Sequence, residues 1–159
     1  MRISVLCVGK IKEKFFSDAI AEYSKRLSRY CTLEIIEVQD EKTPDGAGEA
    51  IEQKIKEKEG ERLLSKFKDG AYYIALAIKG KKLTSEGLAS KIEELGNKGV
   101  GHIGFVIGGS LGLSEAVLGK CDMHLSFSDM TFPHQLMRVI LLEQIYRSYR
   151  IISNEPYHK

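Results

Sequence analysis

The stretch FVIGGSLGLSEAV at residues 105–117 has the pattern of a strand, a glycine-rich turn and a helix. A second stretch, LSFSDMTFPHQLMRVILLEQIYRSYR at residues 125–150, has the pattern of a strand, a loop and a long helix. The chain then ends in NEPYHK, residues 154–159. Two strand ends followed by tight loops favour a ligand-binding edge. A tail with Tyr157 and His158 could supply acid–base chemistry there.

Strand-like and helix-like segments alternate along the whole chain. Short apolar runs predict strands at residues 3–8, 33–38, 72–78, 103–107 and 123–127. Helical periodicity and capping residues predict helices at residues 14–30, 51–64, 84–96, 114–119 and 133–150, with a loop at residues 80–82. This alternation predicts one α/β domain over residues 1–159, with a mainly parallel sheet and helices on both faces. Ligands bind such sheets at the carboxyl ends of strands, here residues 76–80, 108–112 and 127–132.

Two residues bear on the predicted helix boundaries. Gly60 is a weak point of the charged helix, because glycine is a poor helix former. Pro133 is predicted at the first position of the last helix, where its missing N–H is tolerated best.

The composition is that of an ordinary soluble protein. Of the 159 residues, 43% are hydrophobic and 29% are charged, which is enough for one apolar core. The net charge of +2 permits an anionic partner without requiring one. Cys7, Cys31 and Cys121 are widely spaced, which disfavours a disulfide framework or a zinc site. We expect Cys7 and Cys121 to be buried thiols in a reducing cytoplasm, and no apolar run approaches membrane-spanning length.

The last predicted helix is apolar in almost every direction. A helix that packs on one sheet needs an apolar stripe only about 100° wide. Its apolar residues exceed that stripe: Leu136, Met137, Val139, Ile140, Leu141, Leu142 and Ile145. The excess favours a second copy of the chain as a burial partner. The alternative is a helix buried between the sheet and other helices.

The turn at residues 108–112 contains glycines that allow a ligand to approach the backbone closely. Ser114 follows as the predicted cap of a short helix. The turn lacks the spacing of a dinucleotide fingerprint, and the chain has no phosphate-binding P-loop. A plain strand-to-helix turn is therefore an equal alternative.

Residues 127–132 combine two aromatic rings and a methionine with small polar groups. This mixture suits a cofactor that has an adenine ring and an apolar tail, although these side chains could instead fill the core. Three residues are candidates for an acid or base, namely His134, Tyr157 and His158. His102 and His124 lie beside or within strands and are predicted to be structural, and Asp129 has no identifiable partner.

These stretches, together with ALAIKGKKLTSE at residues 75–86, closely resemble the large-subunit ribosomal RNA methyltransferase H family of the SPOUT superfamily. The similarity extends from Met1 to Lys159. The resemblance implies a cytoplasmic homodimer with a C-terminal trefoil knot that forms the S-adenosylmethionine pocket. It also implies methylation of N3 of pseudouridine 1915 in 23S rRNA of the assembled ribosome, without a metal.

The resemblance assigns roles to particular residues. Its cofactor-binding positions are Leu76, Gly108, Phe127, Ser128, Asp129, Met130, Thr131 and Phe132. Its positions for substrate binding or catalysis are Arg147, Tyr157 and His158. We expect His158 to be the general base, with Tyr157 as the second choice, and Arg147 to hold a phosphate or the developing anionic base edge.

The tail of one subunit could complete the partner's site, because the last helix is also the expected dimer face. Two other functions remain open from the residues alone. One is a nucleotide-binding α/β protein with different chemistry, and the other is a ribosome-binding module without catalytic activity.

Overall fold

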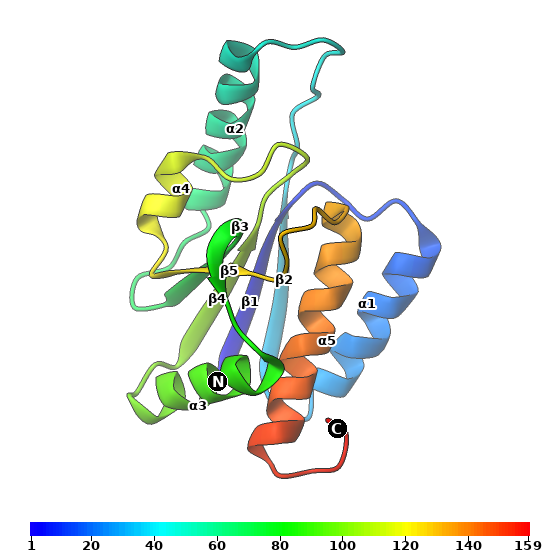
Figure 1. Cartoon of the computed structure of the whole chain (residues 1–159), viewed down its shortest axis with the longest axis vertical. Coiled ribbons are helices and arrows are strands. Elements are labelled where there is room, and N and C mark those ends of the chain that lie inside the picture. Colours follow the sequence, from blue (N-terminus) through cyan, green and yellow to red (C-terminus); the bar gives the residue numbers. More distant parts are fainter.

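A five-stranded parallel sheet lies at the centre of the computed structural model, which describes residues 1–159 (Figure 1). Its strands are β1 (Arg2–Val8), β2 (Thr32–Val38), β3 (Tyr72–Lys82), β4 (His102–Ile107) and β5 (Met123–Ser126), in the order β2-β1-β4-β3-β5. Consecutive parallel strands need crossover connections. The helices are α1 (Lys14–Leu27), α2 (Glu49–Leu64), α3 (Ser85–Asn97), α4 (Glu115–Lys120) and, after β5, α5 (His134–Ile152). The α/β class and the predicted alternation are confirmed.

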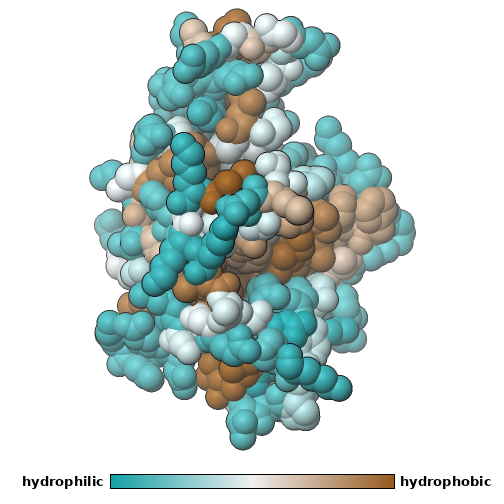
Figure 2. Space-filling view, viewed as in Figure 1, coloured by the Kyte–Doolittle hydropathy of each residue, from teal (hydrophilic) through white to brown (hydrophobic).

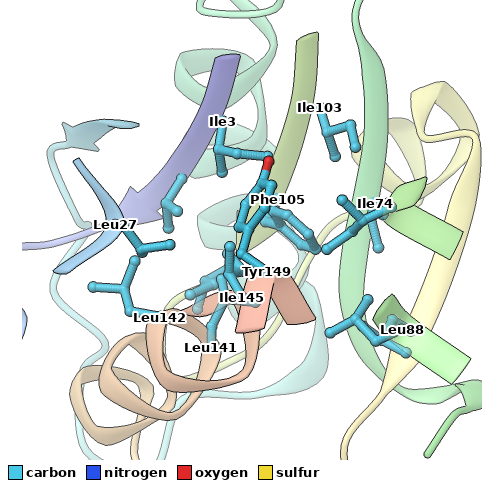
Figure 3. Close-up of a cluster of buried hydrophobic side chains, with 14 of the residues drawn as sticks. Ile3, Leu27, Ile74, Leu88, Ile103, Phe105, Leu141, Leu142, Ile145 and Tyr149 are labelled. Carbon is cyan, nitrogen blue, oxygen red and sulfur yellow. The ribbon is translucent and has the colours of Figure 1, made fainter. Parts of the chain in front are cut away.

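Helices cover both faces of the sheet, because successive side chains of a strand point to opposite sides. On one face, Val5 and Phe105 belong to a core shared with α1, α3 and α5. Figure 3 shows Phe105 lying among Ile74, Ile145 and Tyr149 in this core. On the other face, Leu6 and Val106 pack with buried residues of α2 and α4. The prediction of two helical layers is therefore also confirmed.

The predicted loop at residues 80–82 is wrong, because β3 continues through Lys82. Gly80 makes this possible. A Cβ atom there would lie 2.7 Å from the carbonyl carbon of His124, so only glycine lets β3 run so close to β5. The β3–β5 register shifts between Leu76 and Lys81, and both of these residues pair with Leu125. The intervening residues 77–80 therefore form an irregular segment of the strand.

Two helix details also differ from prediction. Helix α2 runs through Gly60 without a break. A Cβ atom on Gly60 would overlap Ser114 Oγ, so this glycine allows α2 to pack closely against the start of α4. Pro133 occupies the capping position before α5, whose first helical residue is His134.

The three cysteines are free, but only Cys7 is buried. Burial raises the pKa of the Cys7 thiol to about 12. Cys121 is only half-buried, so the prediction of a buried thiol there is wrong. None of the helices combines the length and the apolar character needed to cross a membrane.

Helix α5 keeps part of its apolar surface accessible. Leu141, Leu142 and Ile145 are fully buried in the core. The remaining apolar residues of its first half are only half-buried: Leu136, Met137, Val139 and Ile140. Figure 2 shows apolar side chains gathered over α5 and the neighbouring start of α1. The alternative, a helix buried between the sheet and other helices, is therefore met only in part, and the homodimer stays a prediction.

Candidate functional site

The predicted cofactor-binding positions lie along one edge of the sheet. Strand β3 lies between β4 and β5, and Ala75 pairs with Val106 on one side and His124 on the other. Since all three strands are parallel, Gly108 and Phe127 follow their strands at the same carboxyl edge. Leu76, another predicted cofactor-binding position, lies on β3 between these two strand ends.

Gly108 is required by the backbone of its own turn. A Cβ atom there would lie 2.6 Å from the carbonyl carbon of Gly112. The turn closes through a bridge between Gly109 and Gly112, and Gly112 has a positive φ of 86°. Ser114 then caps α4 by accepting a hydrogen bond from the Val117 N–H at 3.3 Å, as predicted.

The segment 127–132 forms a compact turn after β5. Ser128 Oγ accepts a hydrogen bond from the Met130 N–H at 3.0 Å. Lys82 Nζ lies 2.6 Å from Asp129 Oδ2, which gives Asp129 the partner that sequence reasoning missed. The side chain of Met130 is strongly exposed, at 74%, and Thr131 is also exposed. The alternative in which Met130 fills the core is therefore wrong.

A cavity of about 260 Å³ lies between the start of α3, the end of β5 and the middle of α5. Its volume is slightly below the ~300–1,000 Å³ of typical small-molecule pockets. Its wall is mostly apolar with a few polar groups, and consists of Leu83, Thr84, Ser85, Leu88, Leu125, Ser126, Phe127, Phe132, Ile140 and Gln144. Of the predicted cofactor-binding set, only Phe127 and Phe132 belong to this wall.

The C-terminal tail folds back against α5 and against Tyr30, in the turn after α1. Arg150 Nη1 donates to Glu155 Oε2 at 2.7 Å, and its Nη2 donates to the carbonyl oxygen of Pro156 at 2.9 Å. Tyr30 OH donates to Glu155 Oε1 at 2.8 Å. These contacts hold the tail against the fold, whereas the last few residues of many chains are poorly ordered.

The structure brings together the three predicted catalytic residues. Arg147 Nη1 lies 3.2 Å from His158 Nδ1. The Arg147 guanidinium also lies 4.7 Å from the centre of the Tyr157 ring, a cation–π distance. Tyr157 OH donates to Glu143 Oε1 at 3.2 Å, and Arg147 Nη2 donates to the same oxygen at 2.6 Å. We call Glu86, Glu143, Arg147, Tyr157 and His158 together the tail cluster.

Sequence reasoning missed two carboxylates of the tail cluster. Glu86, in the first turn of α3, places Oε1 2.6 Å from His158 Nε2. A backbone hydrogen bond at Glu86 and the contact with His158 lower the pKa of Glu86. Glu143 lies four residues before Arg147, a helical spacing that could have identified this pair. No local pattern indicates Glu86.

Burial and the neighbouring Glu143 carboxylate raise the pKa of Tyr157. Its hydroxyl therefore stays protonated near neutral pH. The hydrogen bond with Glu143 raises the pKa of Arg147, which keeps its charge. A protonated hydroxyl and a charged guanidinium are hydrogen-bond donors, so neither Tyr157 nor Arg147 is a ready proton acceptor.

Hydrogen bonds connect the cavity wall to the tail cluster. Ser85 Oγ donates to Gln144 Oε1 at 2.7 Å. Gln144 Nε2 then donates to Glu143 Oε2 at 2.8 Å. Ser85 and Gln144 are in the wall, while Glu86 and Glu143 are their neighbours in sequence. The cavity wall is therefore connected to the tail cluster through Gln144 and Glu143, while Arg147, Tyr157 and His158 do not line the cavity.

The other histidines lie outside this cluster. His102 is within 2.7 Å of Ser4 Oγ, and His124 Nε2 is 2.8 Å from the carbonyl oxygen of Leu118. Both are structural, as predicted. His134 begins α5, about 20 Å along the helix axis from Arg147. It is therefore not brought to the tail cluster.

A family model described as Predicted SPOUT methyltransferase matches residues 1–158. A protein of Bifidobacterium adolescentis named ribosomal RNA large subunit methyltransferase H is 63% identical to the chain over 159 residues, which is all of both proteins. The chain belongs to this family of SPOUT methyltransferases. Family members of the same name from Clostridium perfringens and Clostridium beijerinckii are 60% and 59% identical, again over 100% of both chains.

Two solved structures resemble this SPOUT family member. A probable methylase family protein from Haemophilus influenzae has a TM-score of 0.54 at 13% identity, and the match covers 99% of this chain and 70% of that one. A probable methyltransferase from Bordetella pertussis has a TM-score of 0.56 at 12% identity, over 92% and 95% of the two chains. Identities this low support the shared fold alone. The SPOUT chain has no group of three or more His, Cys, Asp or Glu that could hold a metal ion.

Proposed function

We propose that this chain transfers a methyl group from S-adenosylmethionine to N3 of pseudouridine 1915 in 23S rRNA, acting on the assembled ribosome in the cytoplasm. The names of relatives at 59–63% identity support an rRNA methyltransferase. The observation that carries the proposal is the tail cluster beside a cavity walled by Phe127 and Phe132.

The residues at the carboxyl edge fit the proposed cofactor. Phe127 and Phe132 offer aromatic surfaces to an adenine ring. Gly108 lets the turn after β4 close against Gly112 at this edge, and the exposed thioether of Met130 is free for apolar contact. Leu76 and the polar residues 128, 129 and 131 complete the proposed binding set. When bound, the cofactor would supply a methyl group on a positively charged sulfur.

The chain's own residues would orient the pseudouridine and accept its N3 proton. Holding the two reactants in place could contribute up to about 7–11 kcal/mol. N3 of pseudouridine carries a proton that must leave, and His158 would accept it as a general base, which typically contributes ~10²–10⁴-fold. Arg147 would bind a phosphate or the anionic edge of the base with its planar guanidinium.

The proposal includes the family's trefoil knot and its homodimer. The resemblance of residues 105–150 to the family supports the knot. The half-buried apolar residues of α5 support this helix as the dimer face.

Mass spectrometry of large-subunit rRNA tests the function. Cells that lack this chain should lose one methyl group at the target nucleotide, and purified chain with S-adenosylmethionine should restore it on their ribosomes. Ribosome binding without restoration would favour a non-catalytic module. Binding of other nucleotides in preference to S-adenosylmethionine would favour different chemistry.

A further inference from the structure

The imidazole of His158 lies between a cation and a carboxylate. Arg147 Nη1 is 3.2 Å from Nδ1, and Glu86 Oε1 is 2.6 Å from Nε2. The His158 side chain is 24% exposed, so it is largely enclosed by the tail cluster. One ring nitrogen therefore faces a positively charged partner and the other faces a negatively charged one.

These partners determine which ring nitrogen carries the proton. A guanidinium can only donate hydrogen bonds, so Nδ1 must present its lone pair to Arg147. An ionised carboxylate can only accept, so Nε2 carries the hydrogen that is donated to Glu86. The arrangement defines a neutral imidazole with its proton on Nε2.

We propose that Glu86 is a positioning residue for methyl transfer, which holds His158 so that Nδ1 accepts the N3 proton of the pseudouridine. This inference rests on the proposed function, because it assigns a role within that reaction. Glu86 acts through His158 and does not touch the reacting atoms.

Arg147 must leave Nδ1 before the proton can reach it. A phosphate or an anionic base edge binds a guanidinium more strongly than a neutral ring nitrogen does. Bound rRNA would therefore attract Arg147 away from Nδ1. The proton of N3 then moves to Nδ1, the electron pair of the broken N–H bond stays on N3, and Glu86 stabilises the resulting imidazolium.

Other charged groups around His158 do not replace Glu86. Glu143 is engaged by Arg147 and Tyr157. Glu86 also lies in the first turn of α3, where the helix dipole favours a carboxylate. On the tail itself, the carboxylate of Glu155 is engaged by Arg150 and Tyr30, and the side chains of Tyr157 and Lys159 provide no negative charge near neutral pH.

The first test locates the ring proton without measuring activity. Nitrogen-15 NMR of the wild-type protein at a pH where His158 is neutral, with its signals assigned through His158→Gln, should show hydrogen on Nε2. Hydrogen on Nδ1 would overturn the proposal. This measurement gives its answer whether or not the chain methylates rRNA.

The second test measures single-turnover methyl transfer to purified ribosomes across pH. Glu86→Gln should lower the rate at least about tenfold, the loss expected when a general base is poorly held. It should also move the acid limb of the pH–rate profile to lower pH, because the imidazolium loses its carboxylate. Glu86→Asp should restore part of the rate. A merely structural role would not move the profile.

Glu94→Gln is the matched control, because Glu94 is an exposed, ion-paired carboxylate on the same helix. It should leave the rate and profile unchanged. A Glu86→Gln enzyme with the wild-type rate and profile would overturn the proposal. If the wild type itself transfers no methyl group, the proposed function fails instead, and the ring measurement alone decides whether Glu86 sets the proton position.

Discussion

His158 is held in place by contacts that begin three residues before it. Arg150 donates hydrogen bonds to the side chain of Glu155 and to the carbonyl oxygen of Pro156, and these bonds hold the tail on α5. A side chain with this support can act as a base with defined geometry. This differs from the mobile end expected for the last residues of many chains.

We predict that His158→Ala lowers methyl transfer at least about tenfold, because it removes the proposed general base. Cofactor affinity should stay unchanged. The wild-type rate should rise with pH as the general base loses its proton, and the variant should lack this rise. Single-turnover rates on purified ribosomes measure both effects. His124→Gln, at an exposed histidine outside the cluster, is the control.

Deletion of residues 157–159 should have an effect at least as large, with the fold intact. An active His158→Ala enzyme with an unchanged pH profile would transfer the role of base to Tyr157 or to water.

Arg147 contacts the tail and no residue of the segment 127–132. We therefore predict that Arg147→Ala lowers activity strongly and leaves the affinity for S-adenosylmethionine nearly intact. Arg147→Lys keeps the charge but loses the planar fork, and should recover ribosome binding more than rate. Calorimetry and single-turnover kinetics separate the two effects. An equal fall in affinity and activity would instead place Arg147 in the cofactor site.

Part of the tail cluster could be predicted from the sequence. The tail sequence NEPYHK and the helix before it indicated Arg147, Tyr157 and His158 through a family resemblance. Glu86 could not be found in this way, because it meets His158 across 72 residues of sequence. Such a contact depends on how α3 and α5 pack, which no local pattern describes.

At the scale of elements, periodicity predicted the strands and helices because their burial is regular. Periodicity failed where a neighbouring segment packs directly against the backbone of a glycine. Gly80 looked like a loop residue, but it lets β3 run against His124 of β5. Gly60 looked like a weak point of α2, but it faces Ser114, which caps α4. In a local sequence pattern, a glycine that breaks an element looks the same as a glycine that allows close packing.

The contact between α2 and α4 gives a prediction about stability. Gly60→Ala places a methyl group on the Ser114 hydroxyl, which must move and lose its cap of α4. We expect a net loss of about 1 kcal/mol in the free energy of unfolding, since overpacking costs ~1–3 kcal/mol and alanine returns up to ~1 kcal/mol of helix propensity. Urea denaturation measures this.

Gly96→Ala is the matched control in α3. Its new Cβ would meet only Met1 Cε at 3.6 Å, an ordinary contact, so it should stabilise by about 0.5–1 kcal/mol. In a Ser114→Ala background, Gly60→Ala should lower the free energy of unfolding by less, because the Ser114 Oγ atom that obstructs the new methyl group is absent. Equal effects of Gly60→Ala and Gly96→Ala would contradict the close α2–α4 contact.

At the scale of the whole molecule, the apolar side chains of α5 exceed what one chain buries. Its core residues face the sheet, while four others in its first half remain half-buried beside the accessible apolar start of α1 (Figure 2). A surface of this kind is stabilised by a partner. The same helix carries Arg147, so the association of two chains would also bring a second subunit near the tail cluster.

We predict a homodimer through α5, with about twice the chain mass of 17.8 kDa in light scattering at micromolar concentration. Val139→Asp places a charge on the half-buried face of α5 and should give a monomer, because a buried unpaired carboxylate is costly. Ile51→Asp, at an exposed apolar residue of α2, is the control and should leave the dimer intact. Circular dichroism would show that both variants fold. A wild-type chain that is folded and monomeric would contradict the prediction, because α5 would then remain uncovered in solution.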